Sequence, residues 1–228
     1  MRPARHVVYL HGFASSPASS KARRFESELA RLGIGFTCPD LNEPAFETLT
    51  VTRMLAQTRG AVARAAGRPV ALIGSSLGAF VAVHAAAEDA GRSVDRLILL
   101  APAFDFGGNR LSRFGDCEIA EWRRRGSVPV LHHALGEPRE IGFALFEDAG
   151  QYDAFTVELA PPVLVFQGRA DTVVDPAMVT VWASARPNVD LRLLDDDHQL
   201  ASSIDEIWRD SERFLSAGPG PTIGSRAS

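Results

Sequence analysis

Residues 69–80 read Pro-Val-Ala-Leu-Ile-Gly-Ser-Ser-Leu-Gly-Ala-Phe, and this stretch decides the fold. Its first five residues form an apolar run, which is typical of a strand buried on both faces. Residues 74–78 then match the pattern G-x-S-x-G, and a helical pattern over residues 77–90 follows at once. The pentapeptide alone arises often by chance, so the strand before it and the helix after it are what give it meaning.

Ser76, the serine at the centre of this pattern, is the candidate nucleophile. A sharp turn here would lift its hydroxyl clear of the sheet while holding its backbone in a strained conformation. The positions on either side then come close together, which favours glycine at Gly74 and Gly78. Ser75 is the competing serine, but the glycine spacing selects Ser76. The non-catalytic alternative is a glycine-rich turn that only caps a helix.

Short β-rich runs alternate with longer helical patterns along the chain, which is typical of a parallel sheet wrapped by helices. The predicted strands are His6–Leu10, Gly35–Cys38, Pro69–Ile73, Val94–Leu100, Pro162–Phe166 and Val189–Leu194. The predicted helices are roughly Ser19–Leu32, Phe46–Ala66, Leu77–Ala90, Ala177–Ala185 and Ala201–Ser216. We expect an α/β fold with a mostly parallel sheet of about six strands flanked by helices, in one domain over residues 1–217. The Gly/Pro/Ser-rich residues 218–228 predict a flexible tail.

A serine hydroxyl needs an adjacent base, and histidine is the usual base near neutral pH. His198 lies directly after the last predicted strand, and functional residues of open parallel sheets collect at the carboxyl ends of strands. A surface histidine beside an acidic run is the alternative. His6 begins the first predicted strand and His84 lies two turns along the helix after Ser76, so we interpret both as structural. His132 and His133 lie in the long insertion, remote in chain order from any predicted strand end.

Asp171 lies just past the penultimate predicted strand and is the candidate acid that would orient the imidazole. Asp175 is a rival, although the proline after it suggests a helix start. Asp195 and its two acidic neighbours are too near His198 in sequence to reach its far nitrogen easily. The chain order Ser76, Asp171, His198 is the one expected for a Ser-His-Asp triad on an α/β-hydrolase fold.

Residues 9–13, Tyr-Leu-His-Gly-Phe, close the first predicted strand. A His-Gly turn here would bring a backbone amide near the nucleophile. We therefore assign the oxyanion hole to the backbone N–H groups of Phe13 and Leu77, and interpret His11 as a brace for the loop.

Residues 9–17, Tyr-Leu-His-Gly-Phe-Ala-Ser-Ser-Pro, with Ser20-Lys21-Ala22 after them, resemble the opening of the YqiA-like small bacterial esterases. Residues 74–80 are similar to the nucleophile region of that family, and Asp171 and His198 fall where it carries its acid and histidine. The resemblance covers residues 6 to about 215 and implies hydrolysis of small acyl esters without a cofactor. The chain departs from the family in a longer insertion over residues 104–160, and in Ala79, where glycine is common.

The insertion is too long for a simple connection and should have its own structure. It leaves the sheet after one strand and returns before the acid-bearing strand, so we expect a small, mostly helical cap above the carboxyl ends. Its aromatic residues are interpreted as the wall of an acyl pocket, with Phe143, Phe146 and Phe155 as substrate-binding candidates. The alternative is that these aromatics form the core of the cap itself.

The composition excludes several classes of partner. A net charge of −4 argues against a nucleic-acid partner, and no apolar stretch reaches 18 residues, so no membrane partner is expected. Residues 6–10 enter a strand at once, which leaves no room for a signal peptide. Cys38 and Cys117 lack metal-ligand spacing and are interpreted as reduced thiols, so we expect a cytoplasmic protein with no metal.

These features predict a serine esterase that cleaves small acyl esters through an acyl-enzyme intermediate. An acyl-thioesterase or acyl-protein thioesterase is the alternative within enzymes. A catalytically silent binding module on the same fold is the alternative outside them. The oligomeric state does not follow from the sequence.

Overall fold

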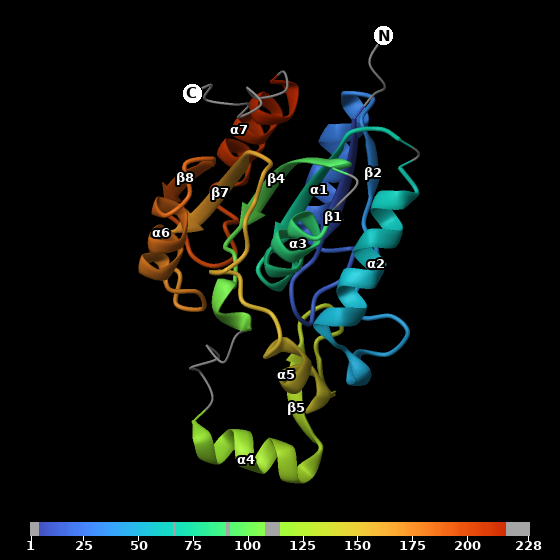
Figure 1. Ribbon diagram of the computed structural model, residues 1–228, viewed down its shortest axis with the longest axis vertical. Helices are drawn as coiled ribbons and strands as arrows, with labels where there is room; N and C mark the ends of the chain where they lie inside the picture. Colours follow the sequence, from blue (N-terminus) through green and yellow to red (C-terminus); the bar gives the residue numbers. More distant parts are fainter. Residues whose placement is uncertain (1–4, 66, 90–91, 108–114, 218–228) are drawn as a thin grey trace, which may run out of the picture.

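The computed structural model describes residues 5–65, 67–89, 92–107 and 115–217. The predicted flexible tail, residues 218–228, lies outside the described residues. Within them, a parallel sheet has the strand order β2-β1-β3-β4-β7-β8 (Figure 1). Its strands are β1 (His6–Leu10), β2 (Gly35–Thr37), β3 (Val70–Ser75), β4 (Val94–Leu100), β7 (Val163–Gly168) and β8 (Val189–Leu194). The six-strand parallel sheet expected from the sequence is confirmed, with strand ends within two residues of the prediction.

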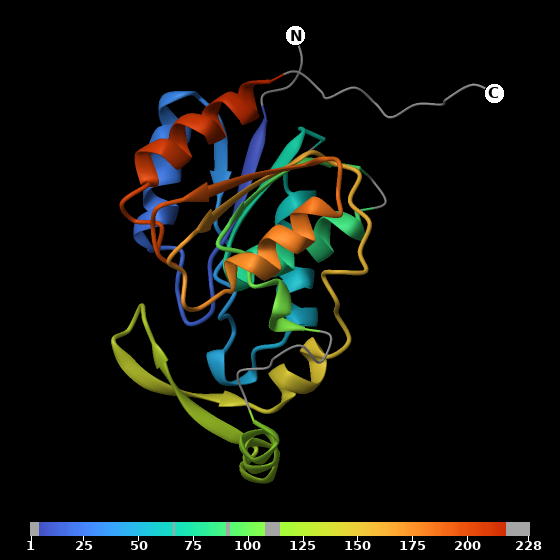
Figure 2. The same ribbon diagram turned by 90° about the vertical axis from the view of Figure 1, so that its left-hand side faces the viewer.

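Helices cover both faces of the sheet, as Figure 2 shows. One face carries α1 (Ser20–Arg31) and α7 (Ile204–Ser216). The other carries α2 (Val51–Ala63), α3 (Leu77–Ala87) and α6 (Pro176–Ser184). Successive strand residues point to opposite faces, so in β1 Val7 packs toward the first face and Val8 toward the second. Because both faces of the inner strands β1, β3, β4 and β7 are buried, these strands are nearly continuous apolar runs, whereas the edge strand β8 alternates apolar and charged residues.

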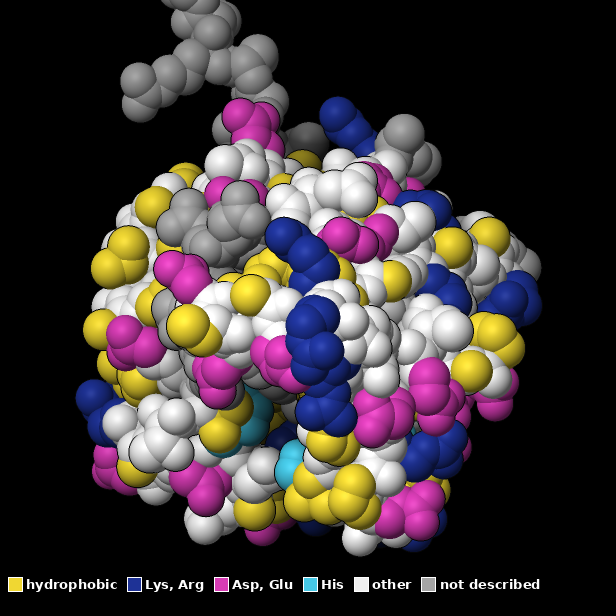
Figure 3. Space-filling model, turned by 90° about the horizontal axis from the view of Figure 1, so that it is seen from below, with side chains coloured by type: hydrophobic (Ala, Val, Ile, Leu, Met, Phe, Trp, Pro, Cys, Tyr) yellow, Lys and Arg dark blue, Asp and Glu magenta, His cyan; other side chains and the backbone are white. Residues whose placement is uncertain are grey.

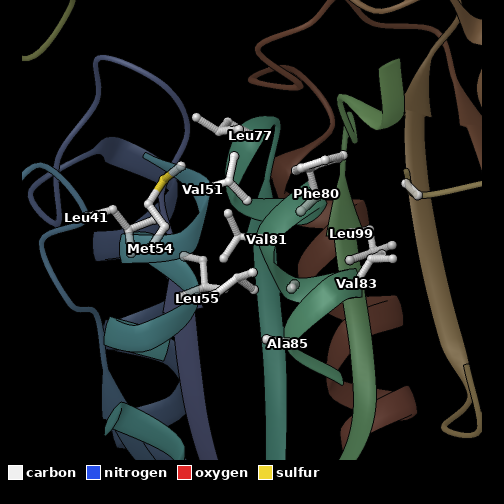
Figure 4. Close-up of a cluster of buried hydrophobic side chains, with 14 of the residues drawn as sticks. Leu41, Val51, Met54, Leu55, Leu77, Phe80, Val81, Val83, Ala85 and Leu99 are labelled. Carbon is white, nitrogen blue, oxygen red and sulfur yellow. The ribbon is translucent and has the colours of Figure 1, made fainter. Parts of the chain in front are cut away.

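Helix α3 lies at the centre of the molecule, and residues 77–86 of it are buried. Leu77 and Val81 face Met54 of α2, whereas Phe80 faces Leu99 of β4 (Figure 4). Each such apolar side chain stabilises the fold by about 1.5–3 kcal/mol when fully buried. The helix that follows Ser76 is therefore held on every side, which fixes the position of that serine.

The insertion forms a cap beyond the carboxyl ends of the strands (Figure 1). It contains α4 (Asp116–Arg125), β5 (Ser127–His132), β6 (Glu137–Gly142) and α5 (Ala144–Ala149), after a short 3₁₀ turn, η2 (Phe104–Phe106). Strands β5 and β6 pair antiparallel as a hairpin that the sequence analysis did not predict. Each strand contains a proline, Pro129 and Pro138, and a proline within a run argues against a strand. A two-stranded sheet tolerates both because each strand is an edge.

Predicted helix Phe46–Ala66 is interrupted in the structure. It divides into a 3₁₀ turn, η1 (Phe46–Thr48), and α2, whose N-cap Thr50 accepts a hydrogen bond from the N–H of Arg53. The Thr50 hydroxyl satisfies a donor that the first turn of a helix leaves free, so the helix begins there. Predicted helix Ala201–Ser216 begins later as well, at Ile204.

Candidate active site

Ser76 lies at the sharp turn between β3 and α3. Its backbone has φ 52° and ψ −115°, a left-handed conformation that is costly for a residue with a side chain. The N–H of Ser76 donates to the carbonyl of Leu100 at 2.9 Å, which ties the turn to β4. A Cβ at Gly74 would lie 2.5 Å from the Cα of Ala79, and one at Gly78 would collide with the carbonyl of Leu10. Both glycines are thus required by close backbone approach.

A chain of hydrogen bonds joins Ser76, His198 and Asp171. His198 Nε2 lies 3.2 Å from Ser76 Oγ, and His198 Nδ1 lies 2.8 Å from Asp171 Oδ2. The Asp171 side chain is fully buried, and that of His198 is 15% exposed. With the ring proton on Nδ1 donated to the carboxylate, Nε2 is left as the acceptor for the Ser76 hydroxyl. The structure thus brings together three residues that lie far apart in the sequence.

The carboxylate of Asp171 is fully engaged. Its Oδ1 accepts from the N–H groups of Val173 at 2.7 Å and Val174 at 2.8 Å, and its Oδ2 also accepts from the amide of Gln167 at 2.8 Å. Burial alone would raise the pKa of Asp171, but hydrogen bonds from His198, Val174 and Gln167 outweigh it and lower the pKa below its usual value. The carboxylate therefore stays charged opposite the imidazole.

The rival candidate for the acid, Asp175, caps a helix instead. Asp175 is the N-cap of α6, and its carboxylate accepts a hydrogen bond of 2.8 Å from the N–H of Ala177. This is the role that the following proline suggested, since proline is favoured in the first turn of a helix.

The loop that carries His198 packs closely on the loop that carries Asp171. The N–H of Ala170 donates to the carbonyl of Asp196 at 3.0 Å, and a Cβ at Gly168 would collide with that same carbonyl. Leu200, which is fully buried, follows with φ 52°. These contacts fix the distance between the two loops and so support the bond between Asp171 and His198.

The backbone after β1 approaches the nucleophile, as the Tyr-Leu-His-Gly-Phe stretch suggested. A Cβ at Gly12 would lie 3.3 Å from the carbonyl oxygen of Ser75 and 3.4 Å from the Cβ of Ser76, so the backbone at Gly12 lies directly beside the nucleophile. Phe13 and Leu77 both line the cavity beside Ser76. Among the described residues, no hydrogen bond engages the N–H of Phe13 or that of Leu77. Their assignment as oxyanion donors stays a prediction.

His11 is buried behind this loop. Its Nδ1 lies 2.9 Å from the carbonyl of Gly12, and its Nε2 lies 3.0 Å from the N–H of Leu41 and 3.3 Å from Asp40 Oδ1. The hydrogen bond with His11, together with the N–H of Asn42, lowers the pKa of Asp40. The ring thus joins the loop after β1 to the segment after β2, which is the bracing position inferred from the sequence.

An apolar cavity of about 240 Å³ opens beside Ser76. The cap supplies one wall through Trp122, Val128, Val130, Ile141, Leu145 and Phe146. The sheet side supplies the other through Phe13, Leu77, Ala103, Asp105, Phe106, Val173 and Val174. Seen from the cap end, the surface is hollowed, with histidine side chains near the hollow (Figure 3). The lining suits an apolar group attached to a carbonyl that lies at Ser76.

The structure separates the three predicted substrate-binding residues. Phe146 lines the cavity, whereas Phe143 lies outside the lining and stacks on Phe146 at 5.4 Å. Phe155 is also outside the lining and packs against the main core. Trp122, one of the insertion aromatics expected to wall the pocket but not one of the three substrate-binding candidates, does line the cavity, and its indole N–H donates to the carbonyl of Ile141 at 3.1 Å. A signal existed, because Trp122 is the one aromatic residue in a highly charged helical stretch.

His84 and His132 are engaged elsewhere and make no hydrogen bond with Ser76. His84 is buried on α3 between the rings of Phe80, at 4.6 Å, and Tyr152, at 5.4 Å. Burial lowers its pKa to about 4, although the charge of Asp153 opposes this. His132 is buried on β5 against Phe46. These positions agree with structural roles.

Residues 5–65, 67–89, 92–107 and 115–217 hold no group of three or more His, Cys, Asp or Glu side chains placed to bind a metal ion. In the same part of the chain, every helix is too short or too polar to cross a bilayer.

Known proteins resemble this chain both in sequence and in structure. The family model described as uncharacterised protein family UPF0227 matches residues 6–212. The chain belongs to this family. The resemblance to the YqiA-like esterases drawn from residues 9–22 and 74–80 is thereby confirmed. A search of the curated proteins finds no match.

Solved structures show that this UPF0227 member has the α/β-hydrolase fold. A protein from Agrobacterium vitis S4, provisionally described as a hydrolase, is 26% identical, with a TM-score of 0.82 over 95% of this chain and 91% of that one. Mouse alpha/beta hydrolase domain-containing protein 10 is 21% identical, with a TM-score of 0.74 over 92% and 89%. Est1E from Butyrivibrio proteoclasticus, solved with ferulic acid bound, is 17% identical, with a TM-score of 0.79 over 94% and 88%. The α/β-hydrolase fold is confirmed, and the comparisons support a hydrolase.

Proposed function

We propose that this protein is a serine esterase that hydrolyses small, apolar acyl esters. The observation that carries the proposal is the hydrogen-bonded series Ser76–His198–Asp171 at the edge of an apolar cavity. A buried carboxylate, an imidazole with one nitrogen free to accept, and a serine hydroxyl at a strained turn together form an activated nucleophile. No step requires a metal or cofactor.

The first half-reaction acylates the enzyme. His198 Nε2 takes the hydroxyl proton as Ser76 Oγ attacks the ester carbonyl carbon. The carbonyl oxygen becomes an oxyanion, for which the N–H groups of Phe13 and Leu77 are the proposed donors, at the end of α3 where the helix dipole is positive. The imidazolium, stabilised by charged Asp171, then gives its proton to the leaving alkoxide, and the alcohol departs. Ser76 is left as an acyl ester.

The second half-reaction restores the enzyme. His198 takes a proton from a water molecule, whose oxygen attacks the acyl carbon. The tetrahedral intermediate collapses, the proton passes from His198 to Ser76 Oγ, and the carboxylic acid is released. Asp171 stays ionised throughout, because its hydrogen bonds favour the charged form.

The cavity supports a substrate with a short to medium acyl chain. The cavity, of about 240 Å³, has room for several apolar non-hydrogen atoms. Each CH₂ that enters contributes about 0.8 kcal/mol, so we expect kcat/KM to rise with chain length until the cavity is filled and then to fall. The apolar lining disfavours an acyl group that ends in a charge.

Turnover and covalent labelling test the proposal. The Ser76→Ala variant should lose hydrolysis of butyryl to octanoyl esters and labelling by a fluorophosphonate. Ser75→Ala, one residue away, is the matched control and should keep both. Parallel assays with thioesters of the same acyl groups separate the esterase from an acyl-thioesterase. Labelling that persists in Ser76→Ala, or a wild-type protein that neither labels nor turns over any acyl substrate, would contradict the proposal.

A further inference from the structure

Lys21 is the only lysine among the 24 basic residues of the chain, and every other one is arginine. It lies in the first turn of α1, shortly after the loop that carries Phe13. Arginine and lysine differ in physical terms. A guanidinium is a planar fork, whereas an ammonium is a compact charge on a flexible stem. The surroundings of Lys21 explain why a lysine, and not an arginine, occupies this position.

The ammonium group of Lys21 binds the loop that carries His198. Its Nζ donates a hydrogen bond of 2.7 Å to the carbonyl of Gln199, the residue directly after His198. The two residues are 178 positions apart in the sequence, so the contact joins α1 to a loop near the C-terminal end of the described residues. The Lys21 side chain is half-buried in this position.

The same loop is attached on its other side to the Asp171 loop. There the carbonyl of Asp196 accepts from the N–H of Ala170 at 3.0 Å. Within the loop, the carboxylate of Asp197 accepts from the N–H of Gln199 at 2.7 Å. Gln199 is therefore held through its N–H by its own loop and through its carbonyl by Lys21. Its neighbour His198 has little freedom to move away from Ser76.

Lys21 also acts on the site through its charge. Burial lowers the pKa of Lys21, while the carboxylates of Asp197, Asp196 and Asp171 raise it. Coulomb interactions are mutual, so the ammonium in turn stabilises ionised Asp171. The charged groups around His198 are Asp171 from the loop after β7, Asp195, Asp196 and Asp197 on its own loop, Arg169 paired with Asp195 at 3.2 Å, and Lys21 from α1.

We propose that Lys21 is a positioning residue for the esterase reaction: through Gln199 it holds His198 against Ser76, and its positive charge favours the neutral imidazole that accepts the serine proton. This role rests on the proposed function. An arginine at this position would keep the charge, but its wider planar head would not reach the Gln199 carbonyl in the same geometry.

Three variants separate these effects in the full-length protein. Lys21→Met removes the donor and the charge and keeps the apolar stem. We expect its kcat on a butyryl ester to fall roughly 10–100-fold, because small misplacements of a catalytic group have effects of this size, with KM nearly unchanged. The acid limb of its rate profile should move to higher pH. Lys21→Arg should keep the wild-type limb and regain only part of kcat. Arg23→Met, exposed on the same helix, is the matched control and should match wild type.

A measurement on the wild-type protein does not depend on how the variants fold. When lysine is ¹³C-labelled at Cε alone, Lys21 gives a single NMR resonance, because it is the one lysine of the chain. Its chemical shift should change in step with the acid limb of the rate profile, and this step should vanish in His198→Ala. An unresponsive resonance would overturn the proposal. So would a Lys21→Met enzyme with wild-type kcat, or one whose loss of kcat leaves the acid limb in place.

The test also keeps this inference apart from the proposed function. If Ser76→Ala retains turnover, the esterase mechanism itself fails. If Ser76→Ala is inactive while Lys21→Met has wild-type kcat and pH profile, the mechanism stands and only the role of Lys21 is removed.

Discussion

The turn at Ser76 and the cap contribute to one cavity, but they are built in opposite ways. The turn is enclosed by β1, β4 and α3, and its two glycines leave no space for a side chain. The cap consists of short helices and a hairpin, and Trp122 is the buried residue of its first helix. The turn thus tolerates almost no change, whereas the cap can vary in detail. Under the proposed function, the sheet side would carry the chemistry and the cap side would select the substrate.

The largest loss of kcat should follow the replacement of Asp171, on the sheet side of the cavity, by the similarly shaped asparagine. Asp171→Asn keeps the shape but removes the charge that stabilises the imidazolium and favours the wrong ring tautomer. We expect kcat to fall on the order of 10³–10⁴-fold, measured with a short acyl ester. The Asp175→Asn variant is the control, because asparagine also caps helices, and it should stay close to wild type. Equal losses in the two variants would contradict the assignment of the acid.

A pair of glycine variants tests the contrast in tolerance. Gly78→Ala places a methyl group against the carbonyls of Leu10 and His11, and we expect a loss of about 3 kcal/mol or more in the free energy of unfolding. Among the described residues, an alanine methyl at Gly115, at the start of α4 in the cap, would meet only the Glu118 carboxylate, at 3.9 Å. Gly115→Ala should lose about 1 kcal/mol at most, as expected for alanine at an N-cap. Chemical denaturation measures both, and similar losses would remove the contrast.

His84 tests the place where the two regions meet, since it lies on α3 against Tyr152 at the end of the cap. Its pKa is lowered to about 4 in the folded protein, so the unfolded chain binds a proton more readily. Stability should therefore be complete above about pH 6.5 and fall by about 3 kcal/mol as the pH drops to about 4. The lowered pKa of Asp171 acts only at still lower pH, because its contribution is lost as the pH falls through that value.

Removing the imidazole should reduce this acid sensitivity. In His84→Leu, the loss of unfolding free energy between pH 7 and pH 4 should shrink, while the exposed His133→Leu keeps the wild-type dependence. Denaturant unfolding at a series of pH values gives the comparison. If both variants have the slope of wild type, buried His84 does not account for it.

The smallest effect should come from the cap wall. Trp122→Leu enlarges the cavity, and we expect the preferred acyl chain to lengthen, with each added CH₂ changing kcat/KM by about fourfold. Trp122→Phe loses the hydrogen bond to Ile141 but keeps an aromatic wall, so its optimum should shift less. Phe155→Leu, outside the cavity lining, should leave the profile fixed. If the change in acyl-chain preference of the three variants only parallels their loss of thermal stability, the cap aromatics serve only the core of the cap.

The two regions also differ in how well they could be predicted. The inner strands of the sheet are short, nearly continuous apolar runs bounded by helical patterns, and the glycines of the turn have the spacing that close backbone packing requires, so both could be predicted. The hairpin was missed because Pro129 and Pro138 argue against strands, and only its isolation as a two-stranded sheet makes them acceptable.

Cavity residues were harder still, because an aromatic residue lines a cavity only if its side chain points that way. Phe146 and Phe143 are close in sequence and stacked on each other, yet only Phe146 lines the space beside Ser76. Valines 128 and 130 face the cavity because they alternate along β5, a signal that depends on recognising the strand first. The catalytic candidates could be predicted without knowing where side chains point. Each follows the end of a strand, and a parallel sheet brings the carboxyl ends of its strands together.

The cap leaves the sheet after β4 and returns at β7, and these strands are hydrogen-bonded neighbours, with Leu97 beside Val163 and Leu100 beside Phe166. The two ends of the insertion are therefore held together by the sheet itself, whatever lies between them. Lengthening a connection whose ends are already fixed has a small entropic cost, about 0.6 kcal/mol for each doubling. The length of the cap can therefore change at little entropic cost, whereas its inner side chains are constrained, because Trp122, Ile141 and Leu145 belong to the main core.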